Sequence, residues 1–329
     1  MYKRQVHGNA TRLDWEIVCP KIVGDEIYIL GNPPYLGSRM QDAQQKIDLE
    51  IVCSSFSKYK VLDYVSCWFI KGANYIDDFN ASLAFVSTNS ICQGEQVALL
   101  WKNILTNNLE IGFAYQSFKW SNSAKNKAGV TCVIIGLRNL INKPKYIFYR
   151  GKKHIVNNIN PYLANGQTKY LESREKPIAN IPKISSGNYT GHALSLSLSE
   201  AEKMELLHSY PESDVLLKKL LGSEEFLNNE IRYCLWISDS QREFAENIPP
   251  IKKRIAEVKK ARLSSKDKSA NQIANRPHQY RDTKETTSTS VIIPTVSSEL
   301  RTYIPVGFIN MDIIVTNRNH IIYDTEPFV

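Results

Sequence analysis

The stretch that decides the fold reads Ile27-Tyr28-Ile29-Leu30-Gly31-Asn32-Pro33-Pro34-Tyr35. Four apolar residues followed by a glycine are typical of a buried strand that opens into a loop. In an open α/β sheet, ligands bind beyond the carboxyl ends of such strands. Residues 32–35 therefore stand where a functional site is expected. A tight turn that merely ends the strand is the alternative interpretation of a Pro-Pro-aromatic sequence.

Strands and helices alternate along the first half of the chain. Short apolar runs predict further strands at residues 81–87, 111–115, 130–137 and 146–149, the second and third of these as candidates for antiparallel neighbours. Apolar and aromatic residues at helical spacing predict helices over 64–75 and 95–105. This alternation predicts an α/β fold for the first half.

The sequence changes character near residue 155, where Asn, Pro, Gly and Ser become frequent and the alternation fades. We therefore expect two domains, 1–155 and 156–329, which the length of 329 residues allows. Ser199 followed by Glu202 predicts a capped helix over 199–208. A second helix is predicted over 251–263, a polar mobile loop over 264–290 and a strand over 291–294.

Composition and charge limit the classes of function. The net charge of +8 and the pI near 9.0 favour an anionic partner such as nucleic acid, although many soluble proteins are mildly basic. The six cysteines are too scattered for a zinc site, so we expect no metal and interpret them as buried hydrophobic residues of a reducing compartment. No apolar stretch approaches the roughly 20 residues of a membrane span. Since the N-terminus also shows no signal core, we expect a cytoplasmic protein.

The residue types of Asn32-Pro33-Pro34-Tyr35 fit methylation of an exocyclic amine. The lone pair of an amino nitrogen on a purine ring is delocalised, which makes that nitrogen a poor nucleophile. The Asn32 side-chain oxygen and the Pro33 carbonyl would accept its two hydrogens and turn the lone pair toward a methyl donor. The prolines fix the backbone and remove competing N–H donors. Tyr35 offers an aromatic face on which an extruded base stacks.

Several segments in order are more specific than these four residues alone. Residues 31–35 resemble motif IV of the amino-methyltransferases that use S-adenosylmethionine, and Asn9-Ala10-Thr11-Arg12-Leu13-Asp14-Trp15 resembles motif III. Residues 85–97 resemble the strand and helix beyond motif V, and residues 118–134 resemble motif VIII with its hairpin. Residues 232–236 and 296–301 resemble blocks of a target recognition domain. Over nearly its whole length, the chain resembles the single-chain Type IIL restriction–modification methyltransferases.

The resemblance implies a fold and a reaction. The fold is α/β: a partial Rossmann-like class I methyltransferase sheet that lacks its first strands, followed by an α+β target recognition domain that is incomplete at its C-terminus. The reaction is site-specific methylation of adenine N6 in double-stranded DNA, within a restriction–modification system. By the same resemblance, the catalytic residues are Asn32, Pro33, Pro34 and Tyr35.

The resemblance also implies three further site residues. Asp14 would contact the adenine part of the cofactor, and Phe118 and Trp120 would wall the flipped base. A helix cap is the alternative role for Asp14. A place in the core of the hairpin is the alternative for the two aromatic residues.

A complete enzyme of this kind carries a glycine-rich cofactor loop and an acidic ribose-binding residue before motif III. The early glycines of this chain, Gly8, Gly24, Gly31 and Gly37, form no Gly-x-Gly pattern after a strand. We therefore predict an internal fragment that lacks its S-adenosyl-L-methionine-binding loop and comes from a truncated gene, a split gene or an engineered piece. For a split gene, the loop would lie on a complementary N-terminal fragment. The isolated chain is expected to show no saturable cofactor binding.

Basic residues of the second domain form the predicted DNA-phosphate surface. They lie in the helix over 251–263, beside an apolar stripe of Ile251, Ile255 and Val258, and in the segment that follows. The predicted contacts are Lys252, Lys253, Lys259, Lys260, Arg262, Arg276 and Arg281. A solvated helix face is the alternative. Candidates for base-edge contacts are His278, Gln279 and Arg281.

Three functions compete at this point. The favoured one is adenine-N6 methylation of duplex DNA. The second is methylation of a protein glutamine or of RNA, since the same four residues serve other planar amines and amides, but a long basic second domain argues against it. The third is a DNA-binding specificity remnant without catalysis, which keeps the recognition domain and needs no cofactor loop.

Overall fold

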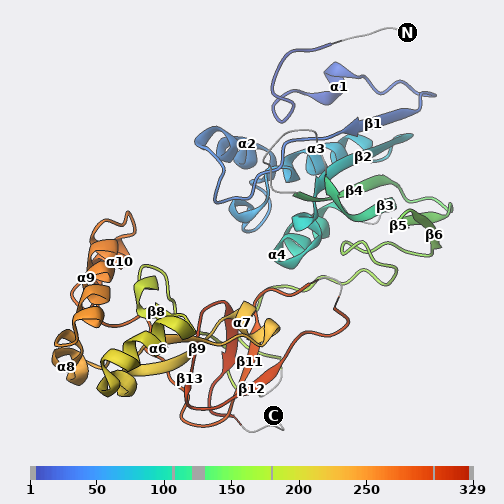
Figure 1. The fold of residues 1–329 in the computed structure, drawn as a ribbon. Helices are drawn as coiled ribbons and strands as arrows, with labels where there is room; N and C mark the ends of the chain where they lie inside the picture. The colour runs from blue at the N-terminus through green and yellow to red at the C-terminus, as the bar shows by residue number, and fades with distance from the viewer. Residues whose placement is uncertain (1–4, 106–107, 121–129, 179–180, 299–300, 326–329) are drawn as a thin grey trace. The chain divides into compact units, whose positions relative to one another are not determined.

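The fold is described by a computed structural model, which covers residues 5–105, 108–120, 130–178, 181–298 and 301–325. Figure 1 shows the course of the chain. The chain divides into two compact units, residues 1–175 and 176–329. The first unit extends beyond residue 155 because Ile159 and Leu163 are buried in its core. We refer to the two as the first unit and the second unit.

The first unit is built around one six-stranded sheet in the order β1-β2-β4-β3-β5-β6. Its strands are β1 (Ile27–Gly31), β2 (Ala81–Thr88), β3 (Leu109–Trp120), β4 (Val130–Asn139), β5 (Lys145–Tyr149) and β6 (Lys152–Val156). Strand β1 pairs in parallel with β2, and β3 pairs in parallel with β5. The antiparallel β4 lies between β2 and β3, which confirms the predicted neighbours.

Helical segments connect the strands of the first unit. They are α1 (Trp15–Val18), α2 (Ala43–Cys53), η1 (Tyr59–Val61), α3 (Ser66–Ile76), η2 (Asn89–Cys92), α4 (Gly94–Gln96), the π-helical η3 (Val97–Trp101) and α5 (Lys102–Ile104). The helix predicted over 95–105 is therefore one segment with a π-helical turn in its middle. The predicted α/β fold is confirmed.

The core of the first unit lies on the face of the sheet that α3 covers. Phe69 of α3 meets Phe85 of β2 edge to face, with ring centroids 5.3 Å apart. Gly72 lets the helix approach closely, since a Cβ there would stand 2.6 Å from Leu83. Trp101 is fully buried against Phe69, and its indole N–H donates to the Ile91 carbonyl at 2.7 Å. Alternate residues of β2 point to this face, as a half-buried strand requires.

The opposite face of the sheet is largely open near β1. Tyr28 and Leu30 point to it with 65% and 78% of their surface exposed, opposite Ser82 and Ala84 in the parallel register. Strand β1 is also the edge of the sheet. Exposed apolar side chains beside a free strand edge form a surface on which another segment can pack.

The second unit contains two four-stranded sheets, β13-β9-β10-β8 and β12-β11-β14-β7. Their strands are β7 (Ser185–Ser186), β8 (Ser197–Leu198), β9 (Leu217–Leu221), β10 (Arg232–Leu235), β11 (Ser290–Pro294), β12 (Gly307–Ile309), β13 (Ile313–Val315) and β14 (Asn319–Ile322). The helical segments are η4 (Leu194–Leu196), α6 (Glu200–Ser209), η5 (Pro211–Leu216), α7 (Ser223–Asn228), η6 (Asp239–Gln241), α8 (Arg242–Glu246), α9 (Pro249–Leu263) and α10 (Lys268–Gln272). This is the expected α+β arrangement.

Local signals account for the two long helices of the second unit. Ser199 and Glu202 form the predicted capping box at the start of α6. Helix α9 begins with Pro249 at its first position, where a missing N–H costs nothing. The predicted apolar stripe of α9 is buried.

The segment 264–290 is not the mobile loop that its polar composition predicts. It contains α10, and its side chains Ala270, His278 and Tyr280 are buried. The reason lies in a buried arginine of α9, described below. Composition alone misses this because backbone carbonyls, rather than apolar side chains, supply much of the anchoring.

Candidate functional site

Four parallel strands of the first unit end at the same edge of its sheet. Strand β1 is parallel to β2, and β3 is parallel to β5; since β4 is antiparallel to both β2 and β3, all four run in one direction. Residues 32–35 follow β1, and Phe118 and Trp120 stand at the end of β3. The topology therefore brings the predicted catalytic and base-pocket residues to the carboxyl edge, where ligands bind in such sheets.

The loop after β1 presents two unengaged acceptors. Asn32 is exposed, and no described residue forms a hydrogen bond with its carboxamide. Pro33 is buried, and within the same described part of the chain its carbonyl accepts no hydrogen bond. Since neither oxygen is engaged within the described part of the chain, both can accept from a ligand without an internal hydrogen bond being broken.

The residue after the loop, Leu36, is held by hydrogen bonds at both its backbone N–H and its backbone carbonyl. Its N–H donates to Asp63 Oδ1 at 2.9 Å. Its carbonyl accepts from the Tyr64 N–H at 3.0 Å and from Gln41 Nε2 at 2.9 Å. Asp63 is almost fully buried, and its second oxygen accepts from Ser90 beyond β2 at 3.4 Å. These contacts tie the exit of the loop to the ends of two other elements.

Sequence reasoning did not find Asp63 or Gln41. The only signal was an acidic residue directly before the predicted helix that begins near Tyr64, which is the ordinary place for a cap. Asp63 does accept from the Val65 N–H at 3.2 Å, as a cap would. Its additional bond to Leu36 spans 27 residues and is visible only in the folded chain.

Tyr35 and Phe118 meet around Cys132. The Tyr35 side chain lies beside the Cys132 thiol, and Cys132 is the strand partner of Phe118 and of Thr88. Burial and the thiol raise the pKa of Tyr35 above its ordinary value of 10.0, so its hydroxyl stays neutral at physiological pH. Trp120 lies further out, 38% exposed, with its ring centroid 6.3 Å from that of Phe118. Half-buried aromatic rings thus stand beside the loop.

A cavity of about 870 Å³ lies against β1 and the loop. Apolar and aromatic side chains form most of its walls, with Trp15, Trp68 and Tyr75 among them, together with Asn32, Pro33 and Pro34. No Asp or Glu is among its lining residues in the described part of the chain. It therefore offers stacking surfaces but no carboxylate for the hydroxyls of a ribose.

Asp14 lies outside this cavity. Its carboxylate accepts from the Glu16 N–H at 2.9 Å and caps α1, which is the alternative role considered from the sequence. The stretch around it is held by Asp48 of α2. Asp48 accepts from Asn9 and Arg12, at 2.9 and 2.7 Å, and from Tyr64 at 2.6 Å. Burial opposes the charge of Asp48, but these bonds outweigh it and hold its pKa below the ordinary 3.8.

Four of the predicted DNA-binding lysines lie on the outer face of α9. Lys252, Lys253, Lys259 and Lys260 are all exposed, and none forms an ion pair with a described residue. Unpaired cations on one helix suit the binding of a phosphate polymer. Arg254, by contrast, is used within the protein, since it pairs with Glu202 at 2.6 Å.

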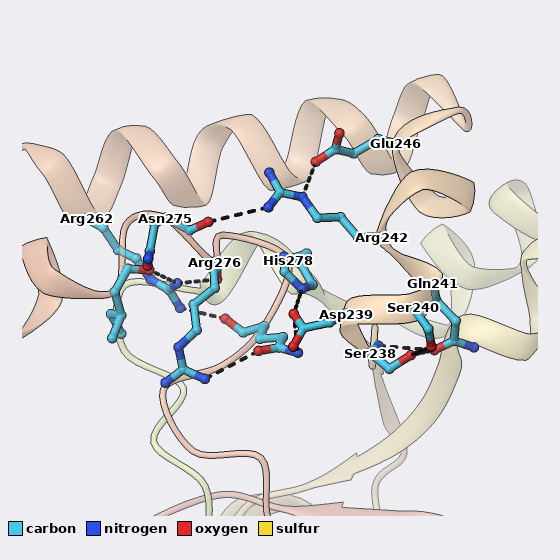
Figure 2. A network of polar contacts seen from close by, with 12 residues as sticks. Ser238, Asp239, Ser240, Gln241, Arg242, Glu246, Arg262, Asn275, Arg276 and His278 are labelled. Atoms are coloured by element: carbon cyan, nitrogen blue, oxygen red, sulfur yellow. Dashed lines mark hydrogen bonds and ion pairs between the residues drawn. The ribbon is translucent and has the colours of Figure 1, made fainter.

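Arg262 does not belong to this basic surface, which corrects the prediction. Its side chain is fully buried, and its guanidinium donates to the carbonyls of Ile273, Arg276 and Gln279 at 2.6 to 2.9 Å. Figure 2 shows this side chain within the network of polar contacts below α9. Burial, with the nearby charge of Arg276, lowers its pKa to about 10. Arg262 therefore clasps the segment 273–279 and has no free face for a phosphate.

The remaining candidates of the second unit differ in accessibility. His278 is buried, with Nε2 2.8 Å from Asp239 Oδ1, and so does not reach a base edge (Figure 2). Arg276 is half-buried and donates to the Arg281 carbonyl at 2.6 Å. Gln279 is half-buried beside Asp239. Arg281 is exposed, with its guanidinium 5.5 Å from the ring centre of Tyr189.

Comparison with known proteins follows this division of the chain. Residues 2–149 match the family model of the MmeI DNA-methyltransferase domain, and residues 165–329 match that of the MmeI target recognition domain. The chain belongs to the MmeI family. Its predicted resemblance to Type IIL methyltransferases is thereby confirmed.

Individual proteins match over nearly all of the chain. DNA methyltransferase A of Bacillus subtilis (strain 168) is 43% identical over 98% of this chain and 37% of its own length. The solved structure of the Type IIL restriction–modification enzyme MmeI in complex with DNA is 34% identical, with a TM-score of 0.85, over 98% of this chain and 44% of that one. The chain thus spans less than half the length of either relative.

The family match places each set of predicted residues in the matching domain. Residues 32–35, Phe118 and Trp120 fall in the methyltransferase domain, and α9 falls in the recognition domain. Parts of two motif stretches, 121–129 and 299–300, lie outside the described residues.

Other site classes receive no support. Across the described ranges, no group of three or more His, Cys, Asp or Glu side chains is placed to hold a metal ion. Five of the six cysteines are buried and Cys19 is exposed; all are free. None of the helices described has both the length and the apolar character to cross a membrane.

Proposed function

We propose that this chain is the catalytic and target-reading part of a DNA methyltransferase that acts on adenine N6. The observation that carries the proposal is the pair of unengaged acceptors, Asn32 Oδ1 and the Pro33 carbonyl, at the carboxyl edge of the sheet. An exocyclic amine has two hydrogens to donate, and these acceptors match them. Accepting both localises the nitrogen lone pair, so that the nitrogen can bond to the methyl carbon as the bond between that carbon and its donor breaks. The extra proton on the nitrogen then passes to water.

The surrounding residues support an extruded base as the substrate. Tyr35 and Phe118 offer aromatic faces beside the acceptors, and stacking of a base on such a ring contributes about 1–3 kcal/mol. The bonds from Asp63 and Gln41 fix the loop before substrate arrives, so that little reorganisation is needed at the moment of reaction. Membership of the MmeI family makes duplex DNA the favoured macromolecule.

The methyl donor of the proposal is S-adenosylmethionine, which supplies an electrophilic methyl group when bound. The cavity beside β1 fits it only in part, because its walls are apolar and aromatic and lack the acidic side chain that a ribose needs. We therefore propose that a complementary segment completes the cofactor site. The exposed Tyr28 and Leu30 on the open face beside the β1 edge favour such a partner.

The proposal predicts that the isolated chain does not bind S-adenosylmethionine saturably. Calorimetric titration of the purified chain is expected to show no binding isotherm. A dissociation constant in the micromolar range would contradict the need for a complementary segment, while leaving the methyltransferase proposal intact.

Recognition of DNA is assigned to the second unit, with the exposed lysines of α9 as phosphate contacts. Phosphate contacts orient the duplex and carry no sequence information. Among the base-edge candidates, Arg281 is exposed, Gln279 is half-buried and His278 is buried, so Arg281 is the favoured contact.

Supplying the part of a relative that this chain does not cover tests the proposed function. The chain is combined with the portion of the Bacillus subtilis relative that it does not cover, and nucleosides from duplex DNA are analysed by mass spectrometry after incubation with S-adenosylmethionine. We expect N6-methyladenine with both parts and none with either alone. DNA binding without any methylated nucleoside would instead favour a non-catalytic specificity remnant. Methylation of RNA or of a protein glutamine, but not of DNA, would favour the second alternative.

A further inference from the structure

The positive charge of the chain is concentrated in one segment of the first unit. Residues 111–171 contain ten Lys or Arg and no Asp or Glu. Subtracting these ten from the 41 Lys and Arg of the whole chain leaves 31 basic residues against 33 acidic ones. The segment therefore carries more than the entire net charge of +8. The basic helix α9 lies outside it.

Within this segment, the hairpin formed by β5 and β6 presents cations to solvent. Its turn is Arg150-Gly151, both residues with positive φ, and β6 begins with Lys152 and Lys153. Arg150, Lys152 and Lys153 are exposed, and none forms an ion pair with a described residue. The two other cations nearby are different, since Arg138 and Lys145 are both paired with Glu110 at 2.8 Å.

Aromatic rings hold two of these cations in place. The guanidinium of Arg150 lies 5.0 Å from the ring centre of Tyr149, and Lys153 Nζ lies 3.8 Å from that of Tyr146. A cation that rests on a ring keeps its charge facing solvent while losing side-chain freedom. Such preorganisation lowers the entropy that binding to an anion would cost.

The turn of this hairpin lies at the same edge of the sheet as the catalytic loop. Strands β5 and β3 are parallel, and β3 runs in the same direction as β1. The carboxyl end of β5, followed by Arg150, therefore lies at the same sheet edge as the carboxyl end of β1, followed by Asn32. Four strand spacings separate β1 from β5 in the sheet order. At about 4.8 Å each they amount to roughly 19 Å. Along a duplex this corresponds to about five or six base pairs at 3.4 Å.

We propose that the β5–β6 hairpin binds the DNA backbone about half a helical turn from the flipped base, through Arg150, Lys152 and Lys153. This inference rests on the proposed function, because it needs a duplex whose base occupies the loop after β1. The hairpin would give the first unit a phosphate-binding site of its own, in addition to the lysines of α9. Lysines that only keep an edge strand from aggregating are the competing explanation.

The salt dependence of DNA affinity separates these explanations. Binding of a labelled duplex is measured by fluorescence anisotropy between about 50 and 200 mM salt for the unaltered chain and for the triple variant Arg150→Gln, Lys152→Gln, Lys153→Gln. Each phosphate contact contributes about 0.9 to the slope of log affinity against log salt. We expect the slope of the triple variant to be smaller by about 2 to 3, and its affinity at about 100 mM salt to be at least roughly tenfold lower.

The matched control is Lys143→Gln. Lys143 is exposed and belongs to the same acid-free segment, but it precedes β5 and therefore lies at the opposite edge of the sheet. Its variant is expected to bind like the unaltered chain. Equal slopes and affinities for the triple variant and this control would overturn the proposal while leaving the proposed function standing. No binding of duplex by the unaltered chain would overturn both.

A second measurement does not depend on the folding of a variant. Lysines of the unaltered chain are acetylated with and without duplex, and their modification is followed by mass spectrometry. We expect duplex to protect Lys152 and Lys153 but not Lys143. Unchanged acetylation of Lys152 and Lys153 under conditions where the duplex is bound would contradict a backbone contact at the hairpin.

Discussion

The two units of this protein use positively charged and polar residues in different ways. In the first unit, functional candidates come from separate strands and are gathered at one sheet edge by the parallel order of β1, β2, β3 and β5. In the second unit, the candidates come from one helix and the segment after it, and neighbouring cations have opposite fates. Lys259 is exposed, whereas Arg262 is fully buried. The position of a motif directly after a strand therefore predicts where its residues lie in the fold. The positive charge of a side chain alone does not predict whether that side chain is exposed or buried.

The spacing within α9 explains the difference. The buried positions are Ile251, Ile255, Val258 and Arg262, so the arginine occupies the next place in the apolar stripe. Burial of a guanidinium is tolerated when most of its donors are satisfied. Three backbone carbonyls accept from the two terminal nitrogens of Arg262, while its Nε has no partner among the described residues. The segment 273–279 is ordered as a consequence.

The largest expected effect on stability comes from removing this clasp. Arg262→Ala removes three hydrogen bonds to backbone carbonyls and opens a space in the core, which is expected to lower the free energy of unfolding by about 3 kcal/mol or more. Lys259→Ala, on the exposed face of the same helix, is expected to change it by less than about 0.5 kcal/mol. Urea titration followed by circular dichroism measures both. Equal free energies of unfolding for the two variants would contradict a stabilising role of the Arg262 side chain.

The next effect concerns the loop of the first unit. Asp63→Ala removes the acceptor for the Leu36 N–H, so the catalytic loop is expected to shift and methyl transfer by the reconstituted enzyme to slow by roughly 10- to 100-fold. Asp63→Asn keeps one oxygen for that bond and is expected to retain most of the rate. The single-turnover rate at saturating DNA is the quantity to compare. A loss confined to DNA affinity, with an unchanged rate, would show that Asp63 does not position the loop.

The smallest effect is a pH dependence of the second unit. Burial lowers the pKa of His278 below its ordinary 6.5, with Asp239 opposing this in part. The folded state thus resists a proton that the unfolded chain accepts, so the stabilisation is present above about pH 6.5 and is lost as the pH falls below it. Melting temperatures at about pH 7.5 and 5.5 should differ more for the unaltered chain than for His278→Gln. An identical pH dependence in both would mean that His278 does not contribute.

Much of the fold was predictable because periodicity reports burial directly. Every predicted strand is present, and so are the helices over 64–75, 199–208 and 251–263, within a few residues. Strand β6 was missed because Lys152-Lys153-His154 has no apolar alternation, and it is a strand only through its pairing with β5. The segment 264–290 was misjudged for the related reason that its anchor, Arg262, is a charged residue.

The candidate site was predictable to the extent that it is local in sequence. The position of residues 32–35 directly after β1 predicted that they lie at the carboxyl edge of the sheet. The pairing of β3 with β4 places Phe118 opposite Cys132, which lies beside Tyr35. Asp63 and the hairpin cations were missed, because the first acts across 27 residues and the second depend on strand direction. Asp14 was predicted from the sequence as a cofactor contact, but in the structure its side chain caps helix α1.

The most direct test of the central claim is the effect of Asn32→Ala on the reconstituted enzyme, measured as single-turnover methyl transfer to adenine alongside duplex affinity. In the proposed mechanism Asn32 supplies one of two acceptors for the amine, so the rate is expected to fall by roughly 100-fold or more. Duplex affinity is expected to stay within about twofold, because phosphate contacts lie elsewhere. A rate that survives the substitution, or a loss explained entirely by weaker DNA binding, would contradict the account.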